Sequence, residues 1–513
     1  MALRVLLAVL ALSFTTAARA DWSMASSKHF VVYSEDKPDR LKAFAERLER
    51  FDAAMRFFSR QPDEEVSPSM RLTVFVVDDV GDIRSLVGKG GYGVAGFYAG
   101  RASGSFAFVP RRAGNGGKFD LDPVSVLQHE YAHHFMLNQF SGAFPAWLVE
   151  GYAEFFATAK AERDGGVVIG SAPLYRAYGL VTGKPLSLQA MVSGDYDRLR
   201  DDQMDALYGR GWLLLHYLLL NTERSGQLVA YLRALEAGKT GADAALAAFG
   251  DLRQLDRELD QYLRARTMKA IGIPADKLSQ PAVVVRPLTP GEDAILDIRM
   301  RSKRGVGGKT APDIYAKASR VAAAYPNDAL VQTTLAEAAF DASRYDEASA
   351  AAHRALAIDP TSTEAMIYRG RALAQRTLAN TSNTPADWTA VRGWYLSANK
   401  LENNDAEPLM LFYQSYAQAG ERPTPNAIAA LGQAQRLAPQ DQGLRLTMAR
   451  QLLVDGEGEQ THKMLAPIAY SPHGGALAKA VQALIAELDR AGPAAALAMM
   501  HSSGVEEKAD EEE

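Results

Sequence analysis

The residues best suited to chemistry in this chain lie in one short stretch, His129-Glu130-Tyr131-Ala132-His133. Two histidines four residues apart lie about 40° apart around a helix axis, so both imidazoles can face one metal ion. Glu130 follows the first histidine, where its carboxylate can take a proton from a water molecule on that ion without binding the ion itself. Histidines that only pack can show the same spacing, so a third ligand is needed to favour a metal site.

A third ligand is available about twenty residues later, in a segment that contains Glu150 and Glu154. Catalytic zinc sites use three protein ligands and keep a fourth position open. Positions 134 to 149 separate His133 from Glu150, which is enough for one helix to end and the next to return antiparallel. Glu154, one helical turn after Glu150, can accept a hydrogen bond from a ligand histidine. The alternative for Glu154 is an exposed salt bridge.

This pair of helices resembles the gluzincins, the metallopeptidases of the thermolysin and aminopeptidase-N type, and especially exported bacterial peptidase MA-like domains. The resemblance covers about residues 27–270, and residues 128–156 are its diagnostic part. It implies the following roles: one catalytic zinc ion bound by His129, His133 and Glu150, a general base at Glu130, and a carboxylate that orients a ligand at Glu154.

Other candidate residues follow from the same resemblance. Gluzincins usually have a tyrosine or histidine on a later helix that donates a hydrogen bond to the oxyanion, and residues 206–212 resemble that helix. Tyr208 is therefore the candidate, with a core or helix-capping tyrosine as the alternative. The histidines His29, His134 and His216 are expected to be structural, since none forms another close pair at ligand spacing.

Two further features bear on the class of peptidase. Metzincins do not fit, because Met136 and Gln139 stand where their pattern needs glycine and histidine. Residues 67–128 contain no glutamate that could hold a free amino terminus, so an endopeptidase is slightly favoured over an aminopeptidase. The alternative is that Asp78, Asp79 and Asp82 hold the amino terminus instead. Gluzincins hold the substrate backbone along the edge of a sheet, and the resemblance implies residues 105–109 as the strand at that edge.

The elements around these residues predict an α/β (α+β) domain. Short β-branched and aromatic runs predict strands at residues 29–33, 72–77 and 105–109, and residues 38–60 have helical spacing. Residues 122–160 form a predicted helical hairpin, with Asp122 as the cap of its first helix. We therefore expect the metal-binding helix to pack on a mixed sheet.

The chain after residue 311 resembles the tetratricopeptide repeats. Pro326 and Pro360 are 34 residues apart, which is the period of that family, and Pro439 and Pro472 are 33 apart. A polar insert at residues 380–387 breaks the register. The resemblance implies an all-α solenoid whose concave surface binds a peptide or another protein, although the sequence does not identify the partner. The alternative is that the repeats only support the catalytic domain.

The expected domain organisation combines these patterns with the composition at the junctions. Residues 281–304 have an extended pattern and are followed by glycines, which predicts a linker. The expected segments are a signal peptide at 1–20, a gluzincin-like domain at 21–272, an extended segment and linker at 273–310, tetratricopeptide-like repeats at 311–500, and an acidic disordered tail at 501–513.

Composition and the first residues indicate where the protein acts. Arg4, the apolar residues 5–14 and Ala18-Arg19-Ala20 are typical of an export signal, so we expect a periplasmic or secreted protein. No later stretch approaches the ~20 apolar residues of a membrane-spanning helix, so none is expected after signal cleavage. The 56 Lys and Arg against 61 Asp and Glu argue against nucleic acid as a partner. The chain contains no cysteine, so its fold must be stabilised without disulfides.

Together these patterns predict an exported zinc-dependent peptidase acting on a peptide or protein substrate. The competing hypothesis is a catalytically inactive, metallopeptidase-like protein whose repeats serve as an interaction scaffold in the cell envelope.

Overall fold

The computed structural model describes residues 22–87, 96–112, 122–140, 142, 144–183, 186–194, 201–265, 267–280, 282–471 and 474–505. The predicted export signal, residues 88–95 and residues 506–513 of the acidic tail lie outside the described residues. The fold combines a mixed sheet near the N-terminus with a helical C-terminal region, as the sequence predicted at this coarse level.

A six-stranded mixed sheet forms the centre of the N-terminal region. Its strands, in spatial order, are β4 (Phe97–Ala99), β5 (Phe106–Arg112), β3 (Leu72–Asp79), β2 (Phe30–Ser34), β1 (Ser23–Ser26) and β9 (Val284–Pro287). The three central strands β5, β3 and β2 are parallel, and the outer strands pair antiparallel to their neighbours. The strands predicted at residues 29–33, 72–77 and 105–109 are confirmed as β2, β3 and β5.

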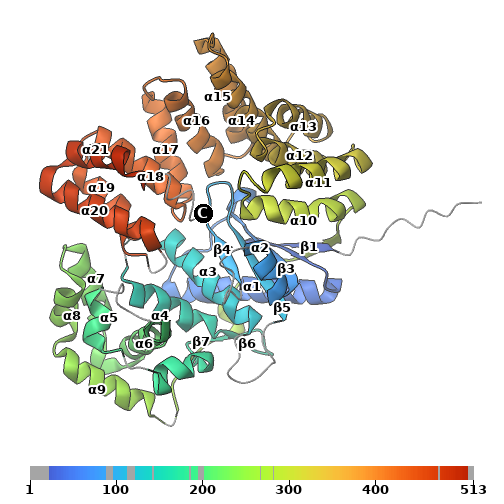
Figure 1. Ribbon diagram of the computed structural model, residues 1–513. Coiled ribbons are helices and arrows are strands. Elements are labelled where there is room, and N and C mark those ends of the chain that lie inside the picture. Colours follow the sequence, from blue (N-terminus) through green and yellow to red (C-terminus); the bar gives the residue numbers. More distant parts are fainter. Residues whose placement is uncertain are drawn as a thin grey trace, which may run out of the picture.

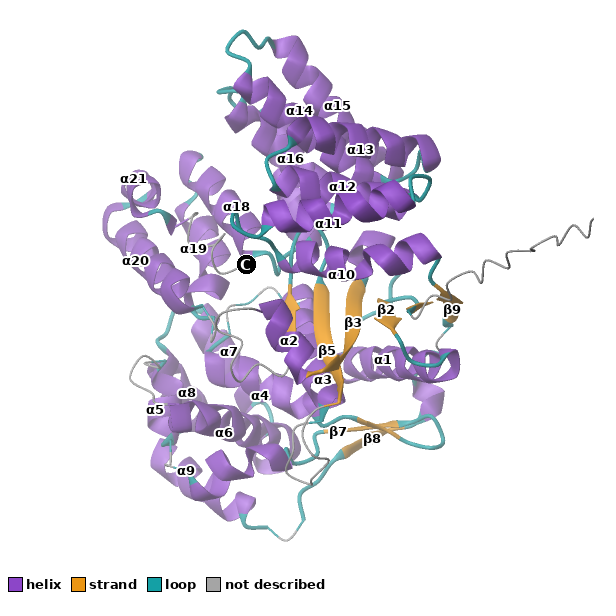
Figure 2. Ribbon diagram, turned by 45° about the vertical axis from the view of Figure 1, so that its right-hand side comes forward, coloured by secondary structure: helices purple, strands orange, loops and turns teal. Residues whose placement is uncertain are grey.

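Helices cover both faces of this sheet (Figure 2). One face packs against α1 (Pro38–Ser59) and α3 (Pro123–Gln139), and their shared core includes Phe30, Phe51 and Phe135. The other face packs against α2 (Val80–Val87) and α10 (Pro290–Arg304), around Phe75 and Phe108. Since the central strands are buried on both sides, their continuous apolar sequence follows from their position.

The predicted hairpin is formed by α3 and α4 (Ala146–Ala157), which pack against each other, and α6 (Asp201–Leu220) packs on α4. Asp122 is the residue before α3, but its side chain makes no capping hydrogen bond, so that part of the prediction is wrong. The remaining elements of this region are α5 (Leu188–Ser193), α7 (Gln227–Glu236), α8 (Gly241–Phe249), α9 (Leu252–Leu263) and a small sheet of β6 (Lys160–Ala161), β7 (Val167–Ile169) and β8 (Ile271–Ile273).

The prediction of an extended segment and linker at residues 273–310 is confirmed only in part: the extended pattern is found in β9, but the linker is wrong, because most of this segment belongs to packed structure. β9 pairs with β1, and residues 290–304 form the helix α10 instead of an extended segment. Thr289 and Glu292 form a capping box that starts this helix: Thr289 Oγ1 accepts from the backbone N–H of Glu292, and the Glu292 carboxylate accepts from that of Thr289. Leu296 and Ile295 then face different cores, so α10 joins the sheet to the helices that follow.

The C-terminal helices form an arc beside and above the sheet (Figure 1). They are α11 (Ala311–Ala324), α12 (Ala329–Asp341), α13 (Tyr345–Ile358), α14 (Thr363–Ala379), α15 (Pro385–Leu401), α16 (Ala406–Gln418), α17 (Pro425–Leu437), α18 (Gln442–Val454), α19 (Gly458–Ala469), α20 (Gly475–Ala491) and α21 (Pro493–Ser503). α14 and α15 have 17 residues each, whereas α12 has 13 and α13 has 14, which explains why the register breaks near residue 380. Since α21 ends at Ser503, the first residues assigned to the tail are helical.

None of the helices in the described part of the chain has the length and apolar character needed to cross a membrane.

Candidate metal centre

α3 brings two imidazoles to one point. His129 and His133 are one helical turn apart, and their Nε2 atoms lie 3.1 Å from each other. The opposite side of α3 carries Tyr131 and Phe135, which are buried in the core under the sheet. The burial of that side fixes the rotation of the helix, so the two histidines must face away from the sheet.

α4 brings a carboxylate to the same point. Oε2 of Glu150 lies 3.3 Å from Nε2 of His129 and 3.7 Å from Nε2 of His133. Bonds of about 2.0–2.1 Å in a tetrahedral zinc site place neighbouring ligand atoms about 3.3–3.4 Å apart. Two imidazoles and one carboxylate at this spacing could therefore hold a metal ion, and the set leaves a fourth position open.

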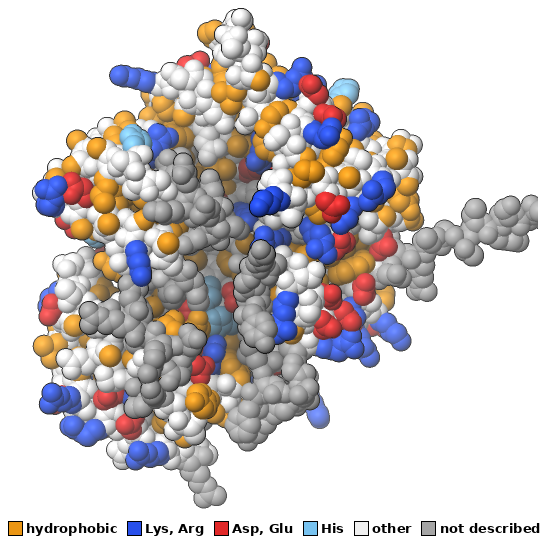
Figure 3. All heavy atoms as spheres, viewed as in Figure 1, with side chains coloured by type: hydrophobic (Ala, Val, Ile, Leu, Met, Phe, Trp, Pro, Cys, Tyr) orange, Lys and Arg blue, Asp and Glu red, His pale blue; other side chains and the backbone are white. Residues whose placement is uncertain are grey.

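The centre is enclosed but open to solvent on one side. Glu150 is fully buried, whereas the side chains of His129 and His133 are 12 % and 11 % exposed. Histidine side chains are visible in a recess near the middle of the face in Figure 3, where Figure 1 places α3. Burial disfavours a charge on His129, but Glu150 and Glu154 outweigh it and raise the pKa of His129 to about 10. The two carboxylates therefore favour a positive charge at this point.

Glu154 lies behind the first histidine, as the sequence predicted. Its Oε1 atom is 3.4 Å from Nδ1 of His129, on the side of the ring away from Nε2. Two residues that the sequence analysis missed hold this carboxylate: Tyr175 donates a 2.6 Å hydrogen bond to Oε2, and Nε of Arg176 donates a 2.8 Å bond to Oε1. Burial alone would raise the pKa of Glu154, but Arg176, His129 and Tyr175 lower it to about 2. Glu154 is thus an ionised, fully buried carboxylate.

No spacing pattern could have identified Tyr175 and Arg176. They lie in a short 3-10 helix, Leu174–Arg176, inside an irregular connection between β7 and α5. Arg176 also pairs with Asp205 of α6 at 3.0 Å, so this connection links α4 to α6 beside the centre.

Tyr208 of α6 also lies at the centre. Its ring stacks on that of His129, with centroids 6.0 Å apart and planes inclined by 24°. The guanidinium group of Arg176 also lies over the Tyr208 ring, 4.5 Å from its centroid. Burial is the main cause of the raised pKa of Tyr208, and Glu150 adds to it, so the hydroxyl stays protonated and can donate.

The approach of α6 to α4 depends on glycine. A Cβ atom on Gly151 would lie 2.5 Å from the backbone carbonyl of Gly211, and one on Gly211 would overlap the carbonyl oxygen of Trp147. Because neither glycine has a side chain, the two helix backbones come into direct contact. This contact brings Glu150 and Tyr208, which are on different helices, to the same centre.

Glu130 lies on α3 beside the first histidine and is half-buried. Burial is the main cause of the raised pKa of both Tyr98 and Tyr208, and the Glu130 carboxylate contributes in both cases. Glu130 is therefore within electrostatic reach of β4 and of α6.

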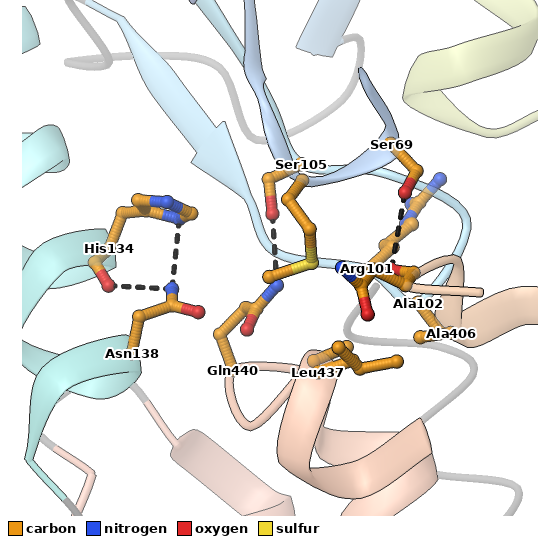
Figure 4. A pocket seen from close by; sticks show the side chains of 12 residues that line it. Ser69, Arg101, Ala102, Ser105, His134, Asn138, Ala406, Leu437 and Gln440 are labelled. Carbon is orange, nitrogen blue, oxygen red and sulfur yellow. Dashed lines mark hydrogen bonds between the residues drawn. The ribbon is translucent and has the colours of Figure 1, made fainter. Parts of the chain in front are cut away.

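Two of the three histidines that were expected to be structural, His134 and His216, contact side-chain or backbone groups away from the centre. Nδ1 of His134 lies 2.8 Å from the Tyr98 hydroxyl, and Figure 4 shows His134 with Asn138 beside the pocket between α3 and the C-terminal helices. His216 lies 2.9 Å from the carbonyl oxygen of Lys269 through Nε2. His29 instead contacts carboxylates, in a separate group of side chains behind α3.

The strand proposed for peptide binding at residues 105–109 is not at the edge of the sheet. β5 pairs with β3 on one side, and its residues Phe106 to Phe108 pair with β4 on the other, so this part of the strand has no free edge. The short strand β4 covers it on that side. Within the described residues β4 is the outer strand at this end of the sheet.

No protein-family model matches the chain, and no curated protein matches it either.

Proposed function

We propose that this chain is an exported zinc peptidase of the gluzincin type, in which His129, His133 and Glu150 hold the metal. The observation that carries the proposal is the convergence of the three ligand atoms at 3.1, 3.3 and 3.7 Å from one another. This spacing fits a tetrahedral zinc ion. Zinc bound here would polarise a peptide carbonyl and make a water molecule more acidic.

The residues of the chain supply the proton transfer and the hydrogen bonds. Glu130 accepts a proton from the attacking water and returns it to the leaving amine. Tyr208 donates a hydrogen bond to the oxygen that becomes negative in the transition state. Glu154 accepts from Nδ1 of His129, which keeps Nε2 of that ring directed at the metal.

The outer strand β4 is the better candidate for substrate binding. It borders α3, and its Tyr98 hydroxyl contacts His134, the residue after the second ligand. An extended peptide that pairs with β4 would add a strand beside the helix that carries the metal ligands. Such pairing uses the peptide backbone and does not need a free terminus, which favours an endopeptidase.

The repeat helices belong to the same proposal as a tetratricopeptide-type domain that recruits protein substrates. They touch the β4–β5 connection directly: Asp441 accepts a 2.6 Å hydrogen bond from the backbone of Ala102, and Gln440 donates a 3.1 Å bond to Ser105. A protein held on the repeats would therefore lie near the outer strand.

The test compares Glu130→Gln with the unchanged protein in cleavage of an unfolded protein substrate. We expect cleavage to fall by at least about a thousandfold while one zinc ion per chain is retained at the centre, because Gln cannot accept the proton. Glu236→Gln, at an exposed position on α7, is the matched control and should cleave normally. Cleavage that persists in Glu130→Gln would contradict the mechanism. A folded wild-type protein that binds zinc at the centre and cleaves nothing would favour the inactive scaffold.

A further inference from the structure

A second group of metal-ligating side chains lies behind α3. His29 in the turn between β1 and β2, Asp52 of α1 and Asp63 after α1 each direct one ligand atom to a common point, and these atoms lie within 4.8 Å of one another. Tyr131 connects this group to α3, since its hydroxyl donates a 2.6 Å hydrogen bond to Oδ1 of Asp52. Tyr131 is about 200° around the helix from His129, so the group is distinct from the first centre.

The orientation of His29 is fixed by Glu49. Nδ1 of His29 lies 2.7 Å from one carboxylate oxygen of Glu49, and the other oxygen accepts a 2.8 Å hydrogen bond from the His29 backbone N–H. Because an ionised carboxylate only accepts hydrogen bonds, Nδ1 carries the proton of this contact. A carboxylate that binds one ring nitrogen and leaves the other to a metal is a common arrangement in metal sites.

The second ring nitrogen of His29 faces two carboxylates. His29 is 6 % exposed, and its Nε2 atom lies 3.5 Å from Oδ2 of Asp52 and 3.4 Å from Oδ1 of Asp63. Among the residues that the structure describes, none forms a hydrogen bond with this buried nitrogen. A ring nitrogen that faces two carboxylate oxygens is unfavourable unless a proton or a metal ion lies between them. Both separations lie within the range of 3.1 to 3.7 Å found between the ligand atoms of the first centre.

The side chains around this group carry more negative than positive charge. Three carboxylates, those of Glu49, Asp52 and Asp63, face two basic side chains. Arg56 is fixed against Asp52 at 2.7 Å and is 13 % exposed, whereas Lys28, which contacts Asp63 at 2.6 Å, is 29 % exposed. Lys28 can therefore turn into solvent. A divalent ion in its place, together with Arg56, would neutralise the three carboxylates.

We propose that His29, Asp52 and Asp63 bind a second divalent transition-metal ion, such as Zn²⁺ or Mn²⁺, with Glu49 orienting the imidazole. One nitrogen and two carboxylate ligands suit these ions better than Ca²⁺ or Mg²⁺, which prefer oxygen alone. The ion links the β1–β2 turn, α1 and the segment after α1, and through Tyr131 it supports the helix that carries the first centre. The competing possibility is a second proton on His29.

The test is the number of zinc ions bound per chain after dialysis against micromolar ZnCl₂, followed by elemental analysis. We expect two ions in the wild-type protein, one in Asp63→Asn, and one in His133→Ala, which disrupts only the first centre. Lys28→Ala removes the competing ammonium group from the surface, so the second ion should bind about tenfold more tightly. One ion in the wild-type protein and none in His133→Ala would overturn the proposal. Unchanged or weaker zinc binding in Lys28→Ala would also overturn the proposal. If Asp63→Asn does not fold, Lys28→Ala provides the test in its place.

Discussion

Oε1 of Glu154 lies 3.4 Å from Nδ1 of His129, on the side of the ring away from the nitrogen that faces the other two candidate ligands. The carboxylate is fully buried and is held in place by Arg176. α4 thus carries both the candidate ligand Glu150 and the carboxylate of Glu154, which contacts the candidate ligand His129 on α3. The geometry of the candidate centre therefore depends on this second contact as well as on the three ligands.

Glu154→Gln should weaken zinc binding. The amide keeps the shape of the side chain but removes the charge that orients His129, so we expect a loss of about 10–100-fold in affinity. Competition with a chelator of known affinity measures this loss. Tyr175→Phe is the control, since it removes one hydrogen bond and leaves the carboxylate charged, and its loss should be smaller. Equal affinity in Glu154→Gln and wild-type protein would show that the contact does not support the metal.

Tyr208→Phe should lower kcat while leaving KM and metal content nearly unchanged. Phenylalanine keeps the stacking on His129 but lacks the hydroxyl that stabilises the transition state. Loss of one such donor costs about 10²–10³ in kcat. Steady-state kinetics on a fluorogenic peptide, with zinc measured on the same samples, tests this. A normal kcat in Tyr208→Phe would show that the Tyr208 side chain only packs at the centre and does not take part in catalysis.

Gly151→Ala should destabilise the protein and weaken zinc binding together. The new methyl group would lie 2.5 Å from the backbone of Gly211, so α4 and α6 must separate, at a cost of about 1–3 kcal/mol. Gly393→Ala in α15 is the control, because the added methyl group would meet no neighbouring atom within 4 Å; there the change should stabilise by about 0.5–1 kcal/mol. Denaturant unfolding gives both values. Equal changes in the free energy of unfolding for Gly151→Ala and Gly393→Ala would mean that the backbones of α4 and α6 are not in direct contact.

Asp405→Asn should stabilise the repeat helices most at alkaline pH. Burial, and then the charge of Glu407, raise the pKa of Asp405 to about 8. A carboxyl group with a raised folded-state pKa holds its proton longer when folded, so stability falls as pH rises from about 4 to 8. Asn removes this loss and keeps an oxygen that accepts from the backbone of Glu407. The difference in melting temperature between the variant and wild type should therefore grow from pH 5 to pH 8.

Asp387→Asn provides a control of opposite sign. Hydrogen bonds from the backbone and the side chain of Thr384 lower the pKa of Asp387, so its ionised form stabilises the fold above about pH 4. This variant should be less stable than wild type at pH 7 and should approach wild type in acid. A difference in melting temperature that does not change with pH in Asp405→Asn would contradict the assignment of that buried carboxyl.

The sequence predicted the candidate ligands because their spacing is local. Helical periodicity places His129 and His133 on one face, whereas Glu150 was assigned from the length of a hairpin together with the resemblance to gluzincins. Arg176 was not predictable, since it reaches Glu154 from an irregular connection that has no period. The second group shows the same limit: His29 and Asp63 are 34 residues apart and meet only because α1 lies between them.

The errors in the predicted fold have two different causes. Residues 290–304 were expected to be extended because of the apolar residues Ile295 and Ile298. That expectation overlooked the capping box of Thr289 and Glu292, which starts the helix α10. The strand β4 has three residues next to glycines, which is too short for an alternating pattern to be recognised. The capping box of α10 is a local signal, whereas β4 is stabilised mainly by its pairing with β5, which a local sequence pattern does not contain.

Anomalous diffraction at the zinc absorption edge, from crystals of the protein prepared with zinc, tests the central claim most directly. We predict an anomalous peak about 2.0–2.2 Å from Nε2 of His129, Nε2 of His133 and a carboxylate oxygen of Glu150. Zinc-loaded crystals without a peak between these three side chains, or with Glu150 turned away from it, would contradict the account.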